Sequence, residues 1–211
     1  MTEPIKHGTP SDYQKNNRIL VSTLAAYGGR EVPKGFDWLK QSCDKFGIEL
    51  TIFGWGDMFV NMYDSKLEYV GYQIYQLRDL YDWVIHIDSA DTLFLRELYG
   101  DLEDCVKGMW FCAERNCFPI EALRQPLMDK APVWTSYKFP NAGGFIGDMK
   151  TVVKTFAYMH YKRVLLNGTP EMTDGTCTTL NDDQAAWCLE ALNGYVGIDY
   201  DCLVFQSLWG G

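Results

Sequence analysis

The sequence is poor in positive charge and in long apolar runs, and each shortage excludes a class of protein. Its 19 Lys and Arg are outnumbered by 28 Asp and Glu, which gives a net charge of −9. Such a surface offers no general attraction for a phosphate backbone, so it disfavours non-specific binding to nucleic acid. No apolar run approaches the roughly 20 residues that span a bilayer, and the first eighteen residues are polar. We therefore expect a soluble protein that does not bind a membrane.

The sequence also lacks closely spaced cysteine pairs. Its seven cysteines contain no C-x-x-C motif, which is the spacing typical of zinc sites and redox-active disulfides. An odd number of cysteines is also a poor fit to a disulfide framework. We therefore expect mostly buried thiols and a reducing cytoplasm as the compartment. The cysteines are Cys43, Cys105, Cys112, Cys117, Cys177, Cys188 and Cys202.

What the sequence does contain is the composition of a globular domain, with 47% apolar, 15% aromatic and 22% charged residues over 211 positions. Residues 1–17 show no periodicity, which predicts a flexible N-terminal arm, and residues 18–211 form one expected domain. Within it, strand-like and helix-like stretches alternate, which predicts an α/β fold with a mostly parallel central sheet and helices on both faces. The expected strands are 18–25, 48–53, 83–87, 108–114, 195–200 and 202–208, and the expected helices are 36–46, 66–81, 95–105, 149–159 and 181–192.

The stretch WVIHIDSADTLF, residues 83–94, is the most informative segment. Its apolar run predicts a buried strand, and two carboxylates three residues apart, Asp88 and Asp91, follow at the carboxyl end. Ligands of open α/β sheets bind at that edge, and two hard oxygen ligands there suit Mg²⁺ or Mn²⁺ bridging a diphosphate. A second interpretation stays open, because Asp-Ser-Ala-Asp also makes a good turn and helix N-cap. His86, inside the strand, is expected to be a core histidine.

Three further segments each have a structural and a functional interpretation. Trp55, between two glycines after an expected strand, either stacks on a base or sugar or packs a loop. The segment NAGGFIG, residues 141–147, either lets a backbone approach a ligand closely or makes a tight turn. Asp182 and Asp183 open a helix, where they serve either as caps or as site carboxylates. In addition, Glu114 ends the expected strand GMWFCAE at a carboxyl edge.

Several short segments form a pattern when they are taken in order along the chain. They are HIDSADTLF, WFCAE, NAGGFIG and DDQ with a later VFQSL. The pattern resembles the glycosyltransferase domain of procollagen lysyl hydroxylases and its collagen-glycosylating relatives. In that family a D-x-x-D segment at a strand end holds Mn²⁺ and the donor diphosphate. A strand ending in S/A-E, a G-G-F-I-G segment, a D-D/S-D-Q helix start and an F-Q-N-L-like strand follow. Four ordered pieces over residues 18–208 are far more specific than one, and the resemblance implies a GT-A fold.

The resemblance also implies a role for each matching residue. The implied metal ligands are Asp88 and Asp91, the implied donor- and sugar-binding residues are Trp55, Asn141, Gly143, Gly144 and Gln184, and the implied catalytic residues are Asp182 and Asp183. Of the last two, Asp183 is expected to position the reacting hydroxyl. Trp55 matches the family more loosely than the other residues do.

The sequence departs from the family in one respect. The family has a further metal ligand, a histidine in an H-G-N-G segment beyond the F-Q-N-L-like strand, and no such segment follows VFQSL here. His7, His86 and His160 stand in other contexts. We expect either a domain truncated at its C-terminus or a metal held by fewer protein ligands and by more donor oxygens and water. Both alternatives predict poor metal affinity without the donor.

These observations together predict the transfer of a hexose from a nucleotide sugar, with UDP-glucose or UDP-galactose as the expected donor, to a hydroxyl acceptor. Mn²⁺ or Mg²⁺ would neutralise charge on the leaving diphosphate, while the protein positions donor and acceptor. The acceptor stays open among hydroxylysine-like protein side chains, glycans and hydroxymethylated bases, and the negative charge disfavours the last. Two other classes also fit, a metal-dependent nucleotidyltransferase or hydrolase and a non-catalytic nucleotide- or sugar-binding module.

Overall fold

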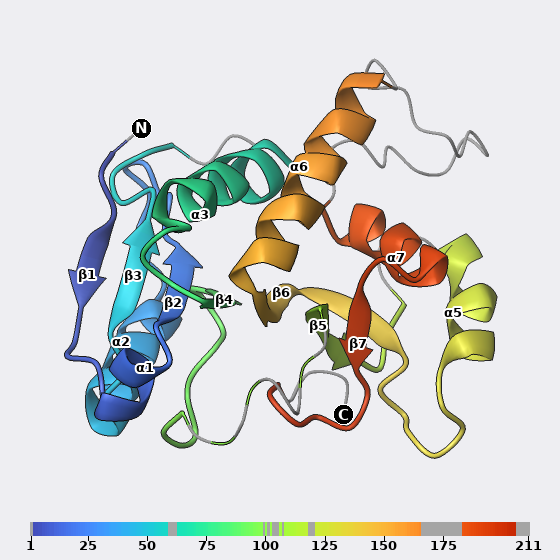
Figure 1. The fold of residues 1–211 in the computed structure, drawn as a ribbon, viewed down its shortest axis with the longest axis horizontal. Coiled ribbons are helices and arrows are strands. Elements are labelled where there is room, and N and C mark those ends of the chain that lie inside the picture. Colours follow the sequence, from blue (N-terminus) through green and yellow to red (C-terminus); the bar gives the residue numbers. More distant parts are fainter. Residues whose placement is uncertain are drawn as a thin grey trace.

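The fold is built on a mixed sheet of seven strands in the order β1-β3-β2-β4-β6-β5-β7 (Figure 1). A computed structural model describes residues 2–58, 63–98, 100, 102, 106, 108–117, 121–165 and 183–205. The strands are β1 (Ile5–His7), β2 (Ile19–Leu24), β3 (Leu50–Phe53), β4 (Trp83–Asp88), β5 (Met109–Glu114), β6 (Phe139–Asp148) and β7 (Gly197–Asp199). Strands β2, β3, β4, β5 and β7 share one direction, whereas β1 and β6 run antiparallel to their neighbours.

Helices cover both faces of this sheet (Figure 1). They are α1 (Asp12–Asn16), α2 (Lys34–Phe46), the π-helix η1 (Tyr63–Val70), α3 (Gly71–Leu77), the 3₁₀-helix η2 (Glu121–Leu123), α5 (Arg124–Lys130), α6 (Met149–Leu165) and α7 (Asp183–Asn193). Helix α2 ends at Gly47, whose left-handed backbone (φ 61°) closes the last turn as its sequence predicts. Within the described part of the chain, no helix has both the length and the apolarity to cross a membrane.

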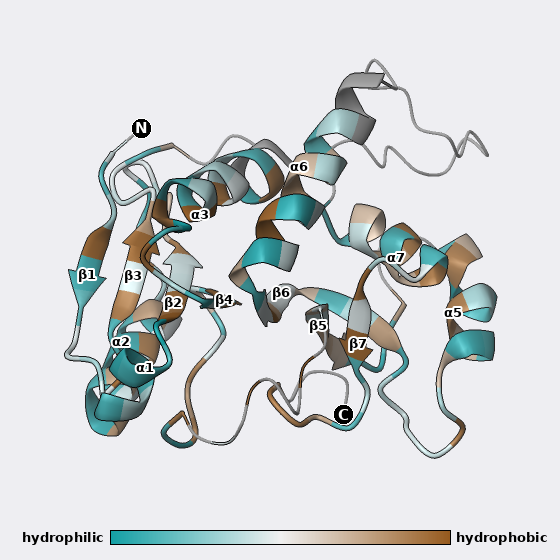
Figure 2. Ribbon diagram, in the orientation of Figure 1, coloured by the Kyte–Doolittle hydropathy of each residue, from teal (hydrophilic) through white to brown (hydrophobic). Residues whose placement is uncertain are grey.

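The alternation of side chains along each strand divides the core into two layers. On β2, Leu20 and Leu24 point to the face covered by η1, α3, α6 and α7, whereas Ile19 and Val21 point to the face covered by α2. Figure 2 shows the corresponding mixture on the helices, where hydrophobic and hydrophilic residues alternate along α3 and α6. The predicted α/β architecture with helices on both faces is therefore confirmed, with a mixed sheet.

The N-terminal residues contain regular elements that the sequence did not predict. Strand β1 pairs antiparallel with β3, so that Lys6 lies opposite Thr51. Helix α1 begins after Ser11, whose hydroxyl accepts a hydrogen bond from the backbone N–H of Gln14, and the Gln14 amide in turn donates to the backbone carbonyls of Ile19 and Glu49. Three residues of edge strand and one short helix carry too little periodicity to be read from sequence.

Three other segments differ from the expectation. The glycine-rich segment 141–147 is part of strand β6 rather than a tight turn, because its backbone groups pair with β4 on one side and β5 on the other. Residues 95–98 of the expected helix 95–105 are not helical, and the chain just before them is held by a hydrogen bond from the Phe94 N–H to Ser42 Oγ on α2. Residues 202–205 form no strand, because the Asp199 carboxylate accepts the backbone N–H groups of residues 203–205.

Candidate active site

The site lies where β4 ends beside β6. Period-two alternation places Asp88 on the same face as Val84 and His86, the face covered by η1. Strand β6 brings Gly143 next to Asp88, so close that a Cβ on Gly143 would lie 2.9 Å from Asp88 Oδ2. A side chain at position 143 would therefore fill the space in front of the carboxylate. Asp88, predicted to bind metal, and Gly143, predicted to bind the donor, thus line the same space.

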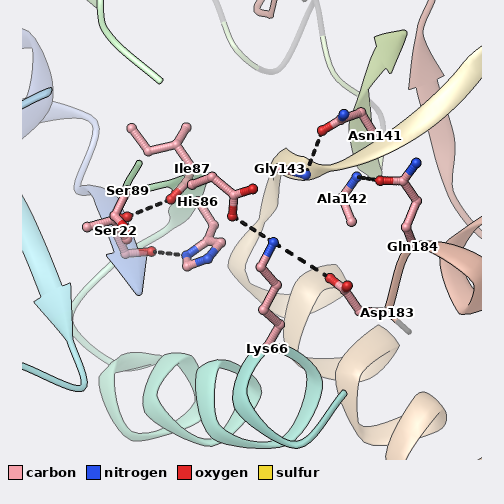
Figure 3. Close-up of polar contacts among 12 residues, drawn as sticks. Ser22, Lys66, His86, Ile87, Ser89, Asn141, Ala142, Gly143, Asp183 and Gln184 are labelled. Carbon is pink, nitrogen blue, oxygen red and sulfur yellow. Dashed lines mark hydrogen bonds and ion pairs between the residues drawn. The ribbon is translucent and has the colours of Figure 1, made fainter. Parts of the chain in front are cut away.

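Lys66 on η1 connects two of the predicted carboxylates (Figure 3). Its Nζ lies 2.6 Å from Asp88 Oδ1 and 3.9 Å from Asp183 Oδ2. Asp183 is buried and the lysine is largely enclosed, with side chains 6% and 14% exposed. Desolvation lowers the pKa of Lys66, but the attraction of Asp88, Asp183 and then Asp91 outweighs it and raises the pKa. The lysine is therefore a fixed positive charge between two carboxylates.

The pair Asp88 and Asp91 offers oxygen ligands at the strand end. Desolvation, followed by the nearby Asp88 carboxylate, raises the pKa of Asp91, so the two carboxylates are close enough to repel each other. Among the described residues, no group of three or more His, Cys, Asp or Glu side chains converges on one point. Mg²⁺ and Mn²⁺ are commonly held by one or two carboxylates plus substrate phosphates and water. The donor set present here fits that mode of binding.

A second polar cluster surrounds Glu114 at the end of β5. Gln184 on α7 donates from Nε2 to Glu114 Oε1 at 2.6 Å. Its Oε1 accepts the backbone N–H of Ala142 at 3.3 Å, as Figure 3 shows. Asn141 also hydrogen-bonds to Glu114, and its Oδ1 accepts the Gly143 N–H at 2.7 Å. Burial raises the pKa of Glu114, and the hydrogen bonds from Asn141 and Gln184 offset part of that effect. This cluster fixes the backbone of β6 beside the site.

His86 lies in the core behind the carboxylates, as the sequence predicts. It is 2% exposed, stacks between Phe53 and Phe145, and its Nδ1 is 3.0 Å from Ser22 Oγ. Burial, and then the charge of Lys66, lowers its pKa to about 3, so the imidazole is neutral at physiological pH. Its Nε2 has no hydrogen-bond partner within the described part of the chain. His86 is therefore a neutral residue of the core.

The enclosed space around Lys66 and His86 is too small for a nucleotide sugar. The cavity that these two residues line together with Asp183 has a volume of about 10 Å³. That is roughly the space that one water molecule needs. Any ligand of that size would lie outside this enclosed space.

Trp55 belongs to an aromatic cluster that contacts the loop after β4. It stacks on Phe36 with ring centroids 5.6 Å apart and planes at 29°, and it remains 38% exposed. Phe36 packs against the edge of Tyr27, whose hydroxyl lies 2.6 Å from Ser89 Oγ. Trp55 therefore packs a loop and also presents part of its surface to solvent, so both interpretations of this residue remain compatible with its position.

The structure brings most of the predicted residues to this edge. Asp88 and Asp183 lie beside Lys66, and Gly143 faces Asp88. Asn141 and Gln184 both hydrogen-bond to Glu114. Gly144 lies beneath the ring of Phe205, because a Cβ there would be 3.1 Å from that ring. Asp182 lies outside the described residues.

Sequence reasoning missed the part that Lys66 and Glu114 play in the site. Glu114 gave a signal, because it ends an expected strand at the carboxyl edge. Lys66 gave none, because a single lysine at the start of a helical pattern is usually solvated. Only the packing of η1 over β4 shows its position between the carboxylates.

The comparisons agree with this arrangement. The family model described as the PLOD GT domain matches residues 15–164, a stretch that includes β2 to β6 with Lys66, Asp88, Asp91, Glu114 and Asn141. A search of curated proteins found no match to the chain. Since the matched stretch covers well over half of the 211 residues, the chain belongs to the family of glycosyltransferase domains found in lysyl hydroxylases.

Proposed function

We propose that the protein is a metal-dependent glycosyltransferase that moves a hexose from UDP-glucose or UDP-galactose to a hydroxyl acceptor. The observation that supports it best is the buried ammonium group of Lys66 within 3.9 Å of both Asp88 and Asp183, at a strand end of a glycosyltransferase-family domain. Perturbed charges grouped at a sheet edge are typical of catalytic sites. The catalytic unit would be residues 18–211, with β1 and α1 added at its edge.

Asp88 and Asp91 would hold Mn²⁺ or Mg²⁺. When bound, the cation supplies Lewis-acid stabilisation of the charge that develops on the leaving diphosphate. Lys66 Nζ lies 2.6 Å from Asp88 Oδ1 and would place a second positive charge beside the same carboxylate. The described ligands leave the remaining coordination positions to donor oxygens and water.

Two groups of residues would bind the donor. Gly143 leaves space in front of Asp88, and Asn141 and Gln184 fix the backbone there, so the hexose would lie against β6 and Gly144. Trp55 stacks on Phe36 but remains 38% exposed, and its exposed surface would stack on the base or sugar.

Asp183 would orient the acceptor hydroxyl, with Asp182 beside it in the sequence. Asp183 begins α7 and faces Lys66 across the same space as Asp88. Its role would be positional, because holding two reactants in register accounts for much of the barrier lowering in group transfer. The acceptor carries a hydroxyl group, and a hydroxylysine-like side chain or a glycan fits an acidic protein better than a nucleic acid does.

We also propose a reducing compartment, the cytoplasm. Every cysteine in the described residues is a free thiol, and burial raises the pKa of Cys43 and of Cys112 to about 12. Protonated, buried thiols of this kind are inert toward disulfide exchange.

The proposal is tested by ligand-induced stabilisation and by turnover. We expect UDP, UDP-glucose or UDP-galactose to raise the unfolding midpoint of the purified chain only when Mn²⁺ is present, because only the native state binds them. Asp91→Ala should abolish Mn²⁺-dependent release of UDP and leave the circular dichroism spectrum unchanged. The matched control is Asp82→Ala, an exposed aspartate that precedes the other end of β4 and pairs with Arg18; it should keep full activity.

Each alternative gives a different result in the same experiment. Full activity in Asp91→Ala would refute the metal assignment. Turnover of nucleoside triphosphates without any sugar acceptor would indicate a nucleotidyltransferase or hydrolase. Stabilisation by UDP-sugars with no turnover on any acceptor would indicate a binding module.

A further inference from the structure

The N-terminus of α2 touches the backbone of the loop that follows β4. Gly35 is the second residue of α2, and a Cβ built on it would lie 1.6 Å from the carbonyl oxygen of Ala90 and 2.6 Å from its carbonyl carbon. Contacts below 3.0 Å are essentially never made by a real Cβ. Both atoms belong to the backbone, so no side-chain rotation relieves the overlap. Only glycine allows the helix and this loop to come so close.

The helical position itself does not require glycine. Gly35 is absent from the glycines with positive φ, so any residue could adopt its conformation. Glycine inside a helix costs about 1 kcal/mol relative to alanine. The close approach to Ala90 is therefore what glycine contributes at this position, at the expense of helix propensity.

Two further contacts hold the same loop against α2 and the segment that precedes it. The hydroxyl groups of Tyr27 and Ser89 lie 2.6 Å apart. The Phe94 N–H donates to Ser42 Oγ at 3.0 Å, and Ser42 is itself anchored to the Leu39 carbonyl at 2.7 Å. The segment from 89 to 94 is thus fixed at three points, and Asp91 lies between them.

We propose that Gly35 is a positioning residue for the two-carboxylate cation site: it lets α2 seat against Ala90, which sets the placement of Asp91 relative to Asp88. This inference rests on the proposed function of those carboxylates. A methyl group at position 35 would displace the Ala90 backbone by about 2 Å, since non-bonded heavy atoms settle about 3.5 Å apart. A displacement of about 1 Å in a site is enough to lower its efficiency roughly 100-fold.

The test compares Gly35→Ala with Gly197→Ala. A Cβ at Gly197 would lie 2.7 Å from the Trp110 ring, a movable side chain next to the edge strand β7 and away from the loop. We expect Gly35→Ala to weaken Mn²⁺ binding in the presence of UDP, measured by electron paramagnetic resonance titration, at least about 10-fold. The half-saturating Mn²⁺ concentration for turnover should rise by the same factor. Gly197→Ala should lower the unfolding midpoint and leave both quantities at their wild-type values.

The outcomes separate the two proposals. A wild-type chain that shows no Mn²⁺-dependent UDP binding would overturn the proposed function. Wild-type binding that is unchanged in a folded Gly35→Ala protein would overturn only the role of Gly35. Where Gly35→Ala does not fold, Tyr27→Phe and Ser42→Ala remove the two hydrogen-bonded anchors without added volume. A weaker Mn²⁺ affinity in both supports the positioning of the loop by α2, and an unchanged affinity in both overturns it.

Discussion

Replacing Lys66 by methionine tests the electrostatics of the site most directly. Methionine keeps most of the length and volume of the lysine stem but removes the ammonium group, so Asp88 and Asp183 lose their shared cation. The wild-type distances are 2.6 Å to Asp88 and 3.9 Å to Asp183. We expect the variant to be less stable than the wild type without metal, and to gain more stability from Mn²⁺.

The size of the effect follows from burial. Removing one partner of a buried ion pair typically costs 3–5 kcal/mol, because the other charge is left without compensation. Asp88 is partly solvated, with 32% of its side chain exposed, whereas Asp183 is only 6% exposed. We therefore take the lower part of that range, about 3 kcal/mol. For a chain of this length, that value corresponds to a fall of roughly 6–12 °C in the unfolding midpoint.

The assay is thermal unfolding of both proteins with and without Mn²⁺, and no donor. The control is Lys40→Met, which breaks a more exposed pair of similar length: Lys40 lies 2.8 Å from Asp37, and their side chains are 29% and 62% exposed. Exposed pairs contribute about 0–1 kcal/mol, so its midpoint should hardly move. The reasoning would be refuted if the unfolding midpoint of Lys66→Met lay within about 2 °C of the wild-type midpoint and responded to Mn²⁺ in the same way. Lys66 would then not compensate the charges of Asp88 and Asp183.

Two further predictions concern His86 and Asp183. Because the folded pKa of His86 is about 3 and the unfolded value is 6.5, its contribution to stability is present above pH 6.5 and is lost as the pH falls toward 3. Between pH 7 and pH 4 this loss of unfolding free energy is about 3 kcal/mol by linkage. The double variant His86→Phe with Ser22→Ala should lack this loss when urea unfolding is measured at the two pH values. An equal loss in the variant would contradict the lowered pKa of His86. Asp183→Ala should keep Mn²⁺-dependent UDP binding in calorimetry while transfer to an acceptor falls about 100-fold, and loss of UDP binding would instead assign Asp183 to the donor side.

Most of the sheet was predictable because its strands are buried and apolar. Strands β2, β3, β4 and β5 appear in the sequence as short runs of apolar and β-branched residues, and α2 as a helical pattern that ends at Gly47. β6 was harder, because glycines weaken the strand signal and its polar residues resemble a turn. Its pairing with both β4 and β5 outweighs that local preference. β1 depends on β3 for its structure and therefore has no pattern of its own.

The site was predictable only where its residues end a recognisable element. Asp88 and Glu114 end strands, and Asp183 begins a helix, so their convergence at one edge follows from topology. Gly35 and Lys66 belong to no motif. Their importance depends on distances between segments far apart in the chain, to Ala90 for one and to Asp88 for the other. Such contacts have no local signature.

The position of Lys66 leads us to expect weak metal binding without the donor. Its Nζ lies 2.6 Å from Asp88 Oδ1 and would compete electrostatically with any cation there. A bound diphosphate would add negative charge to the same space and offset that repulsion. Metal and donor should therefore bind with positive coupling, and by linkage each should raise the affinity for the other by the same factor. The lysine that lies between Asp88 and Asp183 in the free protein is thus also the group that would make metal binding depend on the donor.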